Sequence, residues 1–365
     1  MLYPKKVNVI FDDEGASTQG KIIDVIWSKG KEVVQLIPII LAMVLISISF
    51  ESVAQDPAKG GVVGQKLALK FLFGFAQGAS SSTQAGVDAM QAKLKDLSLG
   101  GIEMNSRGGG VLGSEAQMLE SVQLGTLNAA ALSSPVLTSI LPKMGVFDLP
   151  YIWRDLDHFF TVIDGPLGLS LTKGSEAKGF LVLSQWVGGI RNMYGNKPVY
   201  KVEDLKGVKI RILQSPVFLE SFKAMGATPA PISWPETYQA LQMGTVDAAE
   251  TVLPAMIDAR QYEVSKFAII SRHAINPMSI VVNAKWFNGL PPNVQVALIE
   301  GIKAGQIADR AKYITAERDA IKLLESKGLK VIQPDLEGFR KVAEGIHKQF
   351  SDKIGPETIA AIVGK

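Results

Sequence analysis

The sequence predicts an α/β protein with two lobes that face each other across a cleft. Short apolar runs alternate with longer amphipathic segments, a pattern that indicates strand–helix–strand units with a mainly parallel sheet. The chain has 365 residues, enough for about two domains of ordinary size. It contains no long low-complexity linker and no tandem repeat. We therefore expect several short crossings between the two lobes.

The first expected strand is the apolar segment 67–73, and a helix with a Ser/Thr-rich start follows over 82–97. Further strands are expected at 99–104, 127–132, 180–184, 208–213 and near Val246. Further helices are expected at 114–124, 217–225, 235–243 and from Leu253. Ser114 is the expected N-cap of the second helix. The Gly-rich segment 108–113 lacks the residues of a phosphate loop and the spacing of a dinucleotide fingerprint, so it predicts a tight turn.

The segment 292–327 predicts one long helix. It contains no proline after its first turn, and Gly328 follows it. At 1.5 Å of rise per residue such a helix is roughly 50 Å long. Because this length exceeds one small domain, we expect the helix to span both lobes.

The N-terminal residues 1–54 have the pattern of a leader and secretory signal peptide. Lys29 and Lys31 precede the apolar run 33–50, and small residues lead to an expected cleavage after Ala54. The alternative is an uncleaved membrane anchor, but the run is short for a spanning helix and contains a glutamine and a proline. The leader before the basic pair is unusually long for a signal peptide. We expect the mature protein outside the cytoplasmic membrane, in the periplasm.

The composition excludes several classes of function. The chain has no cysteine, which excludes disulfides, thiol catalysis and Cys-ligated metals. Its three histidines, His158, His273 and His347, are far apart in the sequence, and each is interpreted as a surface or element-end residue. The net charge of +3 comes without a concentrated basic run, so no nucleic-acid partner is expected. We also expect no cofactor and no metal.

A series of short motifs runs from Trp186 to Leu253. In order, they are Gly-Ile-Arg at 189–191, Asn-Lys-Pro-Val at 196–199, DLKGVKIR at 204–211, Gly-Ala-Thr-Pro at 226–229, ETYQALQ at 236–242 and VDAAE at 246–250. Upstream, VLGSEA at 111–116, LGTLN at 124–128 and FDLPY at 147–151 belong to the same series. Each motif alone is weak, but their order and spacing are specific. Over about residues 67–340 the chain resembles the DctP-like solute-binding subunits of TRAP (tripartite ATP-independent periplasmic) transporters.

The resemblance implies a two-lobed periplasmic-binding-protein fold of the Venus flytrap type. We expect lobe I to comprise 55–188 plus 277–316, and lobe II 189–276 plus 317–365. It also implies that the protein binds a small organic carboxylate in the cleft: a sugar acid, an oxo or hydroxy acid, or an aromatic acid. The expected partners are this acid and the small and large membrane permease subunits of the transporter. The alternative is a ligand-loaded sensor that binds a membrane receptor.

The family resemblance assigns Arg211 to the ligand carboxylate. A guanidinium presents paired donors that match a carboxylate and stays charged in a closed cleft. Arg191 corresponds to the family's second cleft arginine and could hold a second carboxylate, an oxo or hydroxyl oxygen, or a contact between the lobes. Trp234 corresponds to an aromatic residue that packs on the ligand's carbon skeleton. Trp186 either lines the cleft or belongs to the core.

Glu115, Ser133 and Thr251 match family positions that face the cleft, where they could bond ligand hydroxyls or an amine. Glu115 could instead stabilise its own helix N-terminus. Thr251 replaces an asparagine of the family pattern, which changes the polar group at this position. Asp247 and Glu250 have no histidine or metal ligand near them in the sequence. Because no nucleophile–base pair is recognisable, we expect a binding protein and not an enzyme.

Overall fold

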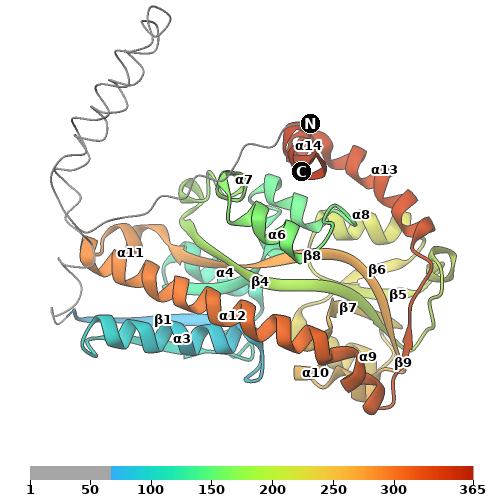
Figure 1. The fold of residues 1–365 in the computed structure, drawn as a ribbon, viewed down its shortest axis with the longest axis horizontal. Coiled ribbons are helices and arrows are strands. Elements are labelled where there is room, and N and C mark those ends of the chain that lie inside the picture. Colours follow the sequence, from blue (N-terminus) through green and yellow to red (C-terminus); the bar gives the residue numbers. More distant parts are fainter. Residues whose placement is uncertain (1–66, 365) are drawn as a thin grey trace, which may run out of the picture. The chain divides into compact units, whose positions relative to one another are not determined.

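A computed structural model describes residues 67–364 (Figure 1). These residues belong to one compact unit. The expected signal peptide and its cleavage site after Ala54 lie outside the described residues. Within the described part, no helix combines the length and the apolar character needed to cross a membrane.

The described chain is mixed α/β. The strands are β1 (Leu69–Phe75), β2 (Ile102–Arg107), β3 (Ala129–Ser133), β4 (Phe180–Gly195), β5 (Lys209–Ile212), β6 (Thr228–Pro231), β7 (Ala248–Val252), β8 (Phe267–Asn283) and β9 (Lys330–Ile332). The α-helices are α3 (Ser82–Leu97), α4 (Glu115–Leu124), α5 (Ser134–Leu137), α6 (Leu156–Ile163), α7 (Pro166–Leu171), α8 (Pro216–Ala224), α9 (Thr237–Gln242), α10 (Leu253–Asp258), α11 (Ala284–Asn288), α12 (Pro292–Ser326), α13 (Glu337–Ile354) and α14 (Pro356–Val363). The 3₁₀ helices are η1 (Pro142–Asp148), η2 (Glu176–Lys178), η3 (Val202–Leu205), η4 (Trp234–Glu236) and η5 (Gln261–Val264).

One sheet runs through the described chain in the order β2-β1-β3-β8-β4-β7-β5-β6, with β9 paired to β8. The three strands β2, β1 and β3 are mutually parallel, and so are β7, β5 and β6. Between these two groups, β4 and β8 form a long antiparallel pair. On its other edge, β8 pairs with β3 of the first group, and β4 pairs with β7 of the second group. The two long strands therefore connect two smaller parallel sheets.

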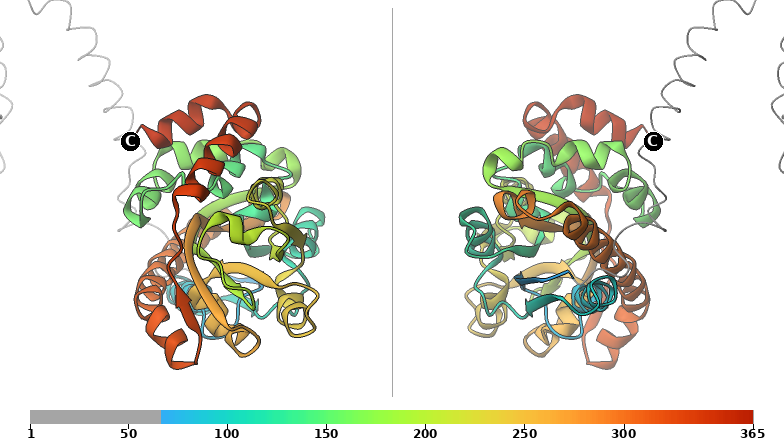
Figure 2. Two further views of the ribbon diagram at one scale, coloured as in Figure 1. Left: turned by 90° about the vertical axis from the view of Figure 1, so that its right-hand side faces the viewer. Right: turned by 90° about the vertical axis from the view of Figure 1, so that its left-hand side faces the viewer.

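Helices cover both faces of the sheet, as alternating residues of β8 demonstrate. Ile280 and Val282 pack in a core cluster with residues of α3 and α12. Val281, between them, packs in a second cluster with residues of α4, α6 and α13. This alternation follows from the two-residue period of a strand. Figures 1 and 2 show α3 and α12 side by side, away from α13 and α14.

The predicted long helix is confirmed as α12, which has 35 residues. Its buried positions recur three or four residues apart along one face, as expected of a helix that packs on a sheet. Near its start α12 packs against α3, and farther along it packs against β4 and α10. It ends just before Gly328, which has a left-handed φ of +90°.

Trp186 lies in the core and not at a cleft, so its candidate role as a ligand contact is wrong. The side chain is fully buried, and its Nε1 donates a hydrogen bond to the carbonyl of Ile302 at 3.2 Å. Its ring fits between α3 and α12 because Gly86 and Gly305 face it. A Cβ at either glycine would lie 2.4 Å from a ring atom. The indole thus fills the space where these two helices meet the sheet.

Most expected elements are present, with shifted ends. The helix over 82–97 is confirmed at both ends. The expected strand 99–104 begins later, at Ile102, because Leu99 and Gly100 form a turn with positive φ. The expected strand 180–184 is only the start of β4, which continues to Gly195.

The C-terminal helices contact both expected lobes. Residues of α13 and α14, among them Phe350 and Ile362, share a core cluster with Phe147 of η1 and Val217 of α8. These helices belong to the stretch 317–365 that was assigned to lobe II. Nothing in the fold divides the chain at the expected lobe boundaries, which therefore stay a prediction.

Candidate functional site

A cavity of about 350 Å³ lies between the two parallel groups of strands. Its lining includes six of the seven candidate residues: Glu115, Ser133, Arg191, Arg211, Trp234 and Thr251. Ser133 ends β3, Thr251 lies near the end of β7, and Arg211 lies near the end of β5. The carboxyl ends of parallel strands are where open α/β sheets bind their ligands. The volume suits a small molecule.

Arg211 is fully buried, yet part of its guanidinium lacks a protein partner. Its Nε donates to the carbonyl of Ile232 at 2.8 Å, and its Nη1 donates to the carbonyl of Glu250 at 3.4 Å. Its Nη2 is buried and has no hydrogen-bond partner among the described residues. The guanidinium carbon lies 5.6 Å from the centre of the Trp234 ring. Burial lowers the pKa of Arg211, and the carboxylate of Glu250 opposes this effect.

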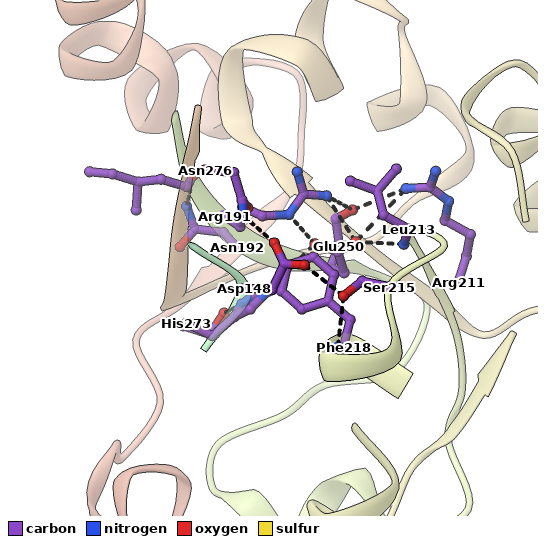
Figure 3. A network of polar contacts seen from close by, with 12 residues as sticks. Asp148, Arg191, Asn192, Arg211, Leu213, Ser215, Phe218, Glu250, His273 and Asn276 are labelled. Carbon is purple, nitrogen blue, oxygen red and sulfur yellow. Dashed lines mark hydrogen bonds and ion pairs between the residues drawn. The ribbon is translucent and has the colours of Figure 1, made fainter. Parts of the chain in front are cut away.

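Glu250 lies between the two arginines (Figure 3). Arg191 binds its carboxylate with two donors, Nε at 2.5 Å from Oε2 and Nη2 at 2.8 Å from Oε1. Arg211 Nη1 lies 3.9 Å from Oε1. Burial raises the pKa of Glu250, but the charge and hydrogen bonds of Arg191 and the nearby His273 ring outweigh burial and hold it at about 2. Glu250 is therefore a permanent anion at neutral pH.

His273 is not a surface or element-end residue, so that interpretation is wrong for this histidine. It lies inside β8, it is 3% exposed, and its Nε2 is 3.5 Å from Oε2 of Glu250. The rings of Phe218 and Phe222 meet it edge-on. Burial lowers the pKa of His273. Glu250 thus has a histidine partner in space that sequence proximity did not reveal.

Glu115 also lines the cavity, and it accepts hydrogen bonds from Ser133 and Gln77. The Ser133 hydroxyl and backbone N–H both donate to Oε2, and Gln77 Nε2 donates to Oε1 at 3.2 Å. Glu115 is also the first residue of α4, where the helix dipole favours a carboxylate. The two interpretations of Glu115 are therefore compatible. Among the described residues, no Lys or Arg forms an ion pair with Glu115.

Asn276 extends the polar lining of the cavity towards a second buried carboxylate, Asp148. The Asn276 amide donates to Asp148 Oδ1 at 2.8 Å, whereas Asp148 Oδ2 accepts from Ser215 at 2.6 Å and Thr138 at 3.0 Å. Burial raises the pKa of Asp148 to about 7, although these hydroxyl donors oppose the rise. The Oδ1 of Asn276 is a buried acceptor without a partner among the described residues.

One hydrogen bond beside the cavity joins two segments that lie far apart in the sequence. The backbone N–H of Ser80, in the loop before α3, donates to Oδ1 of Asp258 at the end of α10, at 3.0 Å. Gly78 permits this approach, because a Cβ there would lie 2.4 Å from Oδ2 of Asp258. Ser80 and Asp258 both line the cavity. We call this contact the Ser80–Asp258 clasp.

The site residues that sequence reasoning missed are Glu250, His273, Asn276, Asp148 and Asp258. Glu250 and Asp148 lie inside the recognised VDAAE and FDLPY motifs, which was a usable signal. His273 and Asn276 lie in β8, a strand that the pattern did not predict. Among the described residues, no group of three or more His, Asp or Glu side chains could hold a metal ion.

The sequence profile of the family "Bacterial extracellular solute-binding protein, family 7", DctP, matches residues 73–353. The chain belongs to the DctP family. The 2,3-diketo-L-gulonate-binding periplasmic protein YiaO of Escherichia coli is 30% identical over 284 residues, which cover 78% of this chain and 84% of that protein. The C4-dicarboxylate-binding periplasmic protein DctP of Rhodobacter capsulatus is 31% identical over 258 residues, 68% of this chain and 76% of that protein.

Solved structures agree with this assignment to the DctP family. The sugar acid binding protein DctPAm from Advenella mimigardefordensis, in complex with galactonate, superposes with a TM-score of 0.79 at 28% identity. The match covers 81% of this chain and 97% of that protein. A TRAP periplasmic solute-binding protein from Polaromonas, bound to D-erythronate, gives a TM-score of 0.78 at 27% identity and covers 80% and 98%. The two-lobed solute-binding fold with a long helix is thus confirmed, and family members are periplasmic transport proteins, not enzymes.

Proposed function

We propose that this DctP-family protein binds a hydroxylated monocarboxylate in the interlobe cavity and delivers it to the small and large permease subunits of a TRAP transporter. The observation that carries the proposal is the Arg211 guanidinium, buried beside the cavity with Nη2 unpartnered. A buried donor without a partner is costly, and a ligand carboxylate would satisfy it. Trp234, beside this guanidinium, would cover the adjacent ligand carbon atoms.

Charge favours one ligand carboxylate over two. Four basic residues line the cavity, and they are matched by three acidic lining residues and Glu250, so each ligand carboxylate adds a negative charge that is not compensated (Arg191, Arg211, Arg260 and Lys312 against Glu115, Asp258, Asp319 and Glu250). A second carboxylate in the cavity would also be repelled by the carboxylate of Glu115, which lines it. A hydroxyl there could instead donate to Glu115, and Thr251 and Asn276 offer further polar partners. Sugar acids and hydroxy acids fit this arrangement better than dicarboxylates do. The galactonate and D-erythronate bound by similar proteins are of this class.

The arrangement also supports a cleft that closes around its ligand. The clasp joins the loop before α3 to α10 across the cavity, which is a contact expected of a closed form. The proposed lobes are 55–188 plus 277–316 and 189–276 plus 317–365, with α13 and α14 packing on both. Ligand contacts that exist only after closure would shift the population towards the closed form. We propose that this closed form docks on the permease. The signal peptide would direct export of the protein to the periplasm.

Calorimetry with galactonate, gluconate, erythronate and succinate tests the ligand proposal. We expect at least one hydroxylated monocarboxylate to bind more tightly than succinate. Replacing Arg211 with alanine should weaken that binding by about 2–3 kcal/mol, or about 30- to 150-fold in Kd, because it removes charge-assisted hydrogen bonds. The control Arg318→Ala, at an exposed arginine of α12, should leave Kd unchanged. Equal affinity in the Arg211→Ala protein would refute the proposed carboxylate contact.

Glu115→Gln tests the discrimination against dicarboxylates. Glutamine keeps the shape of the side chain but removes its negative charge. We expect succinate to gain affinity relative to the hydroxy acid, so that the ratio of their Kd values shifts towards succinate. An unchanged ratio would mean that Glu115 has a structural role, such as stabilising the N-terminus of α4, and does not discriminate between ligands. Delivery is tested separately, by ligand uptake into proteoliposomes that contain the two permease subunits.

A further inference from the structure

A second cavity, of about 460 Å³, lies outside the site described above. It is lined by Tyr151, Trp153, Arg154, Asp155, Leu156, Asp157, Ile190, Arg272, Ala274, Ile275, Leu336 and Arg340, and we call it the rear pocket. Ile190 and Ile275 line it, whereas Arg191 and Asn276, the next residues along β4 and β8, line the interlobe cavity. The two cavities have no lining residue in common, so the rear pocket is a separate site.

Three exposed arginines, Arg154, Arg272 and Arg340, are among the residues that line the rear pocket. The guanidinium carbon of Arg340 lies 5.1 Å from the centre of the Tyr151 ring. Within residues 67–364, none of these three arginines forms an ion pair, whereas Arg191, Arg310 and Arg318 each do. Two carboxylates, Asp155 and Asp157, also line the pocket, so three positive and two negative groups leave one positive charge in excess. Asp155 already accepts a hydrogen bond from the backbone of α6, which it caps.

Trp153 supplies a buried donor at the rear pocket. The residue is 7% exposed, and its Nε1 has no hydrogen-bond partner among the described residues. Phe147 stacks on its ring at 5.8 Å and Phe159 meets it edge-on at 5.1 Å, so the ring is fixed in place. An indole nitrogen can only donate, so it requires an acceptor. Guanidinium groups also only donate, so the donors at this pocket favour a ligand with several acceptor oxygens.

The backbone around the rear pocket is held in an unusual conformation. Tyr151 and Arg272 have φ values of 58° and 44°, two of four non-glycine residues with positive φ in the described chain. Contacts with β8 hold Tyr151 there: its N–H donates to the carbonyl of His273 and its hydroxyl to that of Ser271. Backbone strain of this kind concentrates at ligand sites.

We propose that the rear pocket binds a small oxyanion, a carboxylate or a phosphate, through its arginines and Trp153 Nε1. Each of these groups offers donors that an oxyanion accepts. The site is separate from the interlobe cavity, and its ligand need not be the transported acid.

Indole resonances of the full chain, recorded by ¹H–¹⁵N NMR, test this proposal. Inorganic phosphate and citrate are titrated separately at constant ionic strength, which distinguishes the two oxyanion sources. Trp153 reports on the rear pocket and Trp234 on the interlobe cavity, and the Trp153→Phe and Trp234→Phe proteins assign the two peaks. The variant is Arg272→Asn with Arg340→Gln, because asparagine tolerates the positive φ at position 272. Arg107→Gln, an exposed arginine at the end of β2, is the matched control.

We expect one or both anions to shift the Trp153 peak saturably in the parent and in the Arg107→Gln protein. The double variant should need at least about tenfold more anion, since two charged donors are lost. A Trp153 peak that stays unmoved by both anions, or that moves equally in the double variant, overturns the proposal. A shift confined to Trp234 does so as well. If the double variant does not fold, Arg340→Gln alone, at an exposed position of α13, gives the same comparison.

Discussion

At the scale of single residues, Glu250 is the anion that holds the charged side chains beside the interlobe cavity together. Arg191 donates two hydrogen bonds to the Glu250 carboxylate. Arg211 lies within 4 Å of this carboxylate, and His273 is also close to it. A carboxylate removed from water in this way is stable only while its partners remain. The same carboxylate keeps the Arg191 side chain oriented, which leaves Arg211 with the unpartnered donor.

Glu250→Gln should therefore destabilise the fold strongly. Glutamine leaves two buried guanidinium groups without their anion, and breaking a buried ion pair costs about 3–5 kcal/mol. Urea unfolding followed by circular dichroism measures the change. Glu103→Gln is the control, because Glu103 pairs with Lys70 at the surface and its loss should cost less than about 1 kcal/mol. Similar losses in the two variants would show that the Glu250 cluster adds little to stability.

The sequence was informative for residues inside motifs and uninformative for their partners. Arg211, Arg191, Trp234 and Glu115 could be found because each has a fixed place in a recognisable series. His273 could not, because it approaches Glu250 only through the pairing of β4 with β8 and with β7. Trp186 also lies in the motif region, but its surroundings depend on Gly86 and Gly305, which are distant in sequence.

At the scale of elements, the contact between α3 and α12 depends on two glycines that face Trp186. Gly305→Ala would place a Cβ 2.4 Å from the indole and 2.8 Å from the Gly86 carbonyl. We expect the free energy of unfolding to fall by about 1–3 kcal/mol through overpacking. The control Gly345→Ala, in α13 with no atom within 4 Å, should instead raise it by about 0.5–1 kcal/mol. Opposite signs in urea unfolding would support this packing, and a stabilising Gly305→Ala would contradict it.

The clasp between Ser80 and Asp258 joins two elements that lie far apart in the sequence, and under the proposed function it forms when the cleft closes. Asp258→Ala removes one hydrogen bond, so we expect the Kd of the bound acid to rise about fivefold while the unfolding midpoint without ligand hardly moves. Asp319→Ala is the control, because Asp319 also lines the cavity but, within the part of the chain that the structure describes, forms its ion pair with the neighbouring Arg318. Calorimetry compares the two variants. If both variants raised Kd equally, the loss of affinity would come from removing a negative charge near the cavity and not from breaking the clasp.

Periodicity predicted the helices α3 and α12 well, but it missed α13 and predicted the two longest strands poorly. The helices α3 and α12 have long amphipathic patterns and clear ends. In contrast, β4 contains Gly188-Gly189 and β8 contains Pro277, residues that usually interrupt strands. Register shifts near these positions let the pairing continue. Because β8 is buried on both faces for most of its length, it also lacks the alternation that marks a half-exposed strand.

At the scale of the whole molecule, three carboxylates with raised pKa values affect how stability depends on pH. Burial raises the pKa values of Asp148, Asp309 and Glu317 to about 7 in the folded protein. Between about pH 4.5 and 7 these groups are protonated when folded and ionised when unfolded. The folded state then binds more protons, so the free energy of unfolding should fall as the pH rises through this window. Glu250, with its lowered pKa of about 2, acts oppositely and only below about pH 4.5.

Urea unfolding at pH 5 and pH 8 measures this effect, and Asp148→Asn identifies one contribution. Asparagine cannot ionise, so the difference between the two pH values should be smaller in the variant than in the parent. Asp157→Asn, at an exposed aspartate, should leave the difference unchanged. Burial lowers the pKa values of His273 and His347, which acts in the opposite direction below about pH 6.5, so the comparison of variant with parent is the decisive one. An Asp148→Asn protein whose difference equals that of the parent would contradict the raised pKa of Asp148.

The order of strands in the sheet has a consequence for how the chain folds as it is made. β3 pairs with β1 on one side, but its other neighbour is β8, whose Val282 lies opposite Ala129. Until residues 278–282 have been synthesised, β3 is left with an open edge, the kind of surface that promotes aggregation. The first group of strands therefore cannot be completed ahead of the rest. Such distant pairings slow folding, so refolding from denaturant should be slow for a protein of this size.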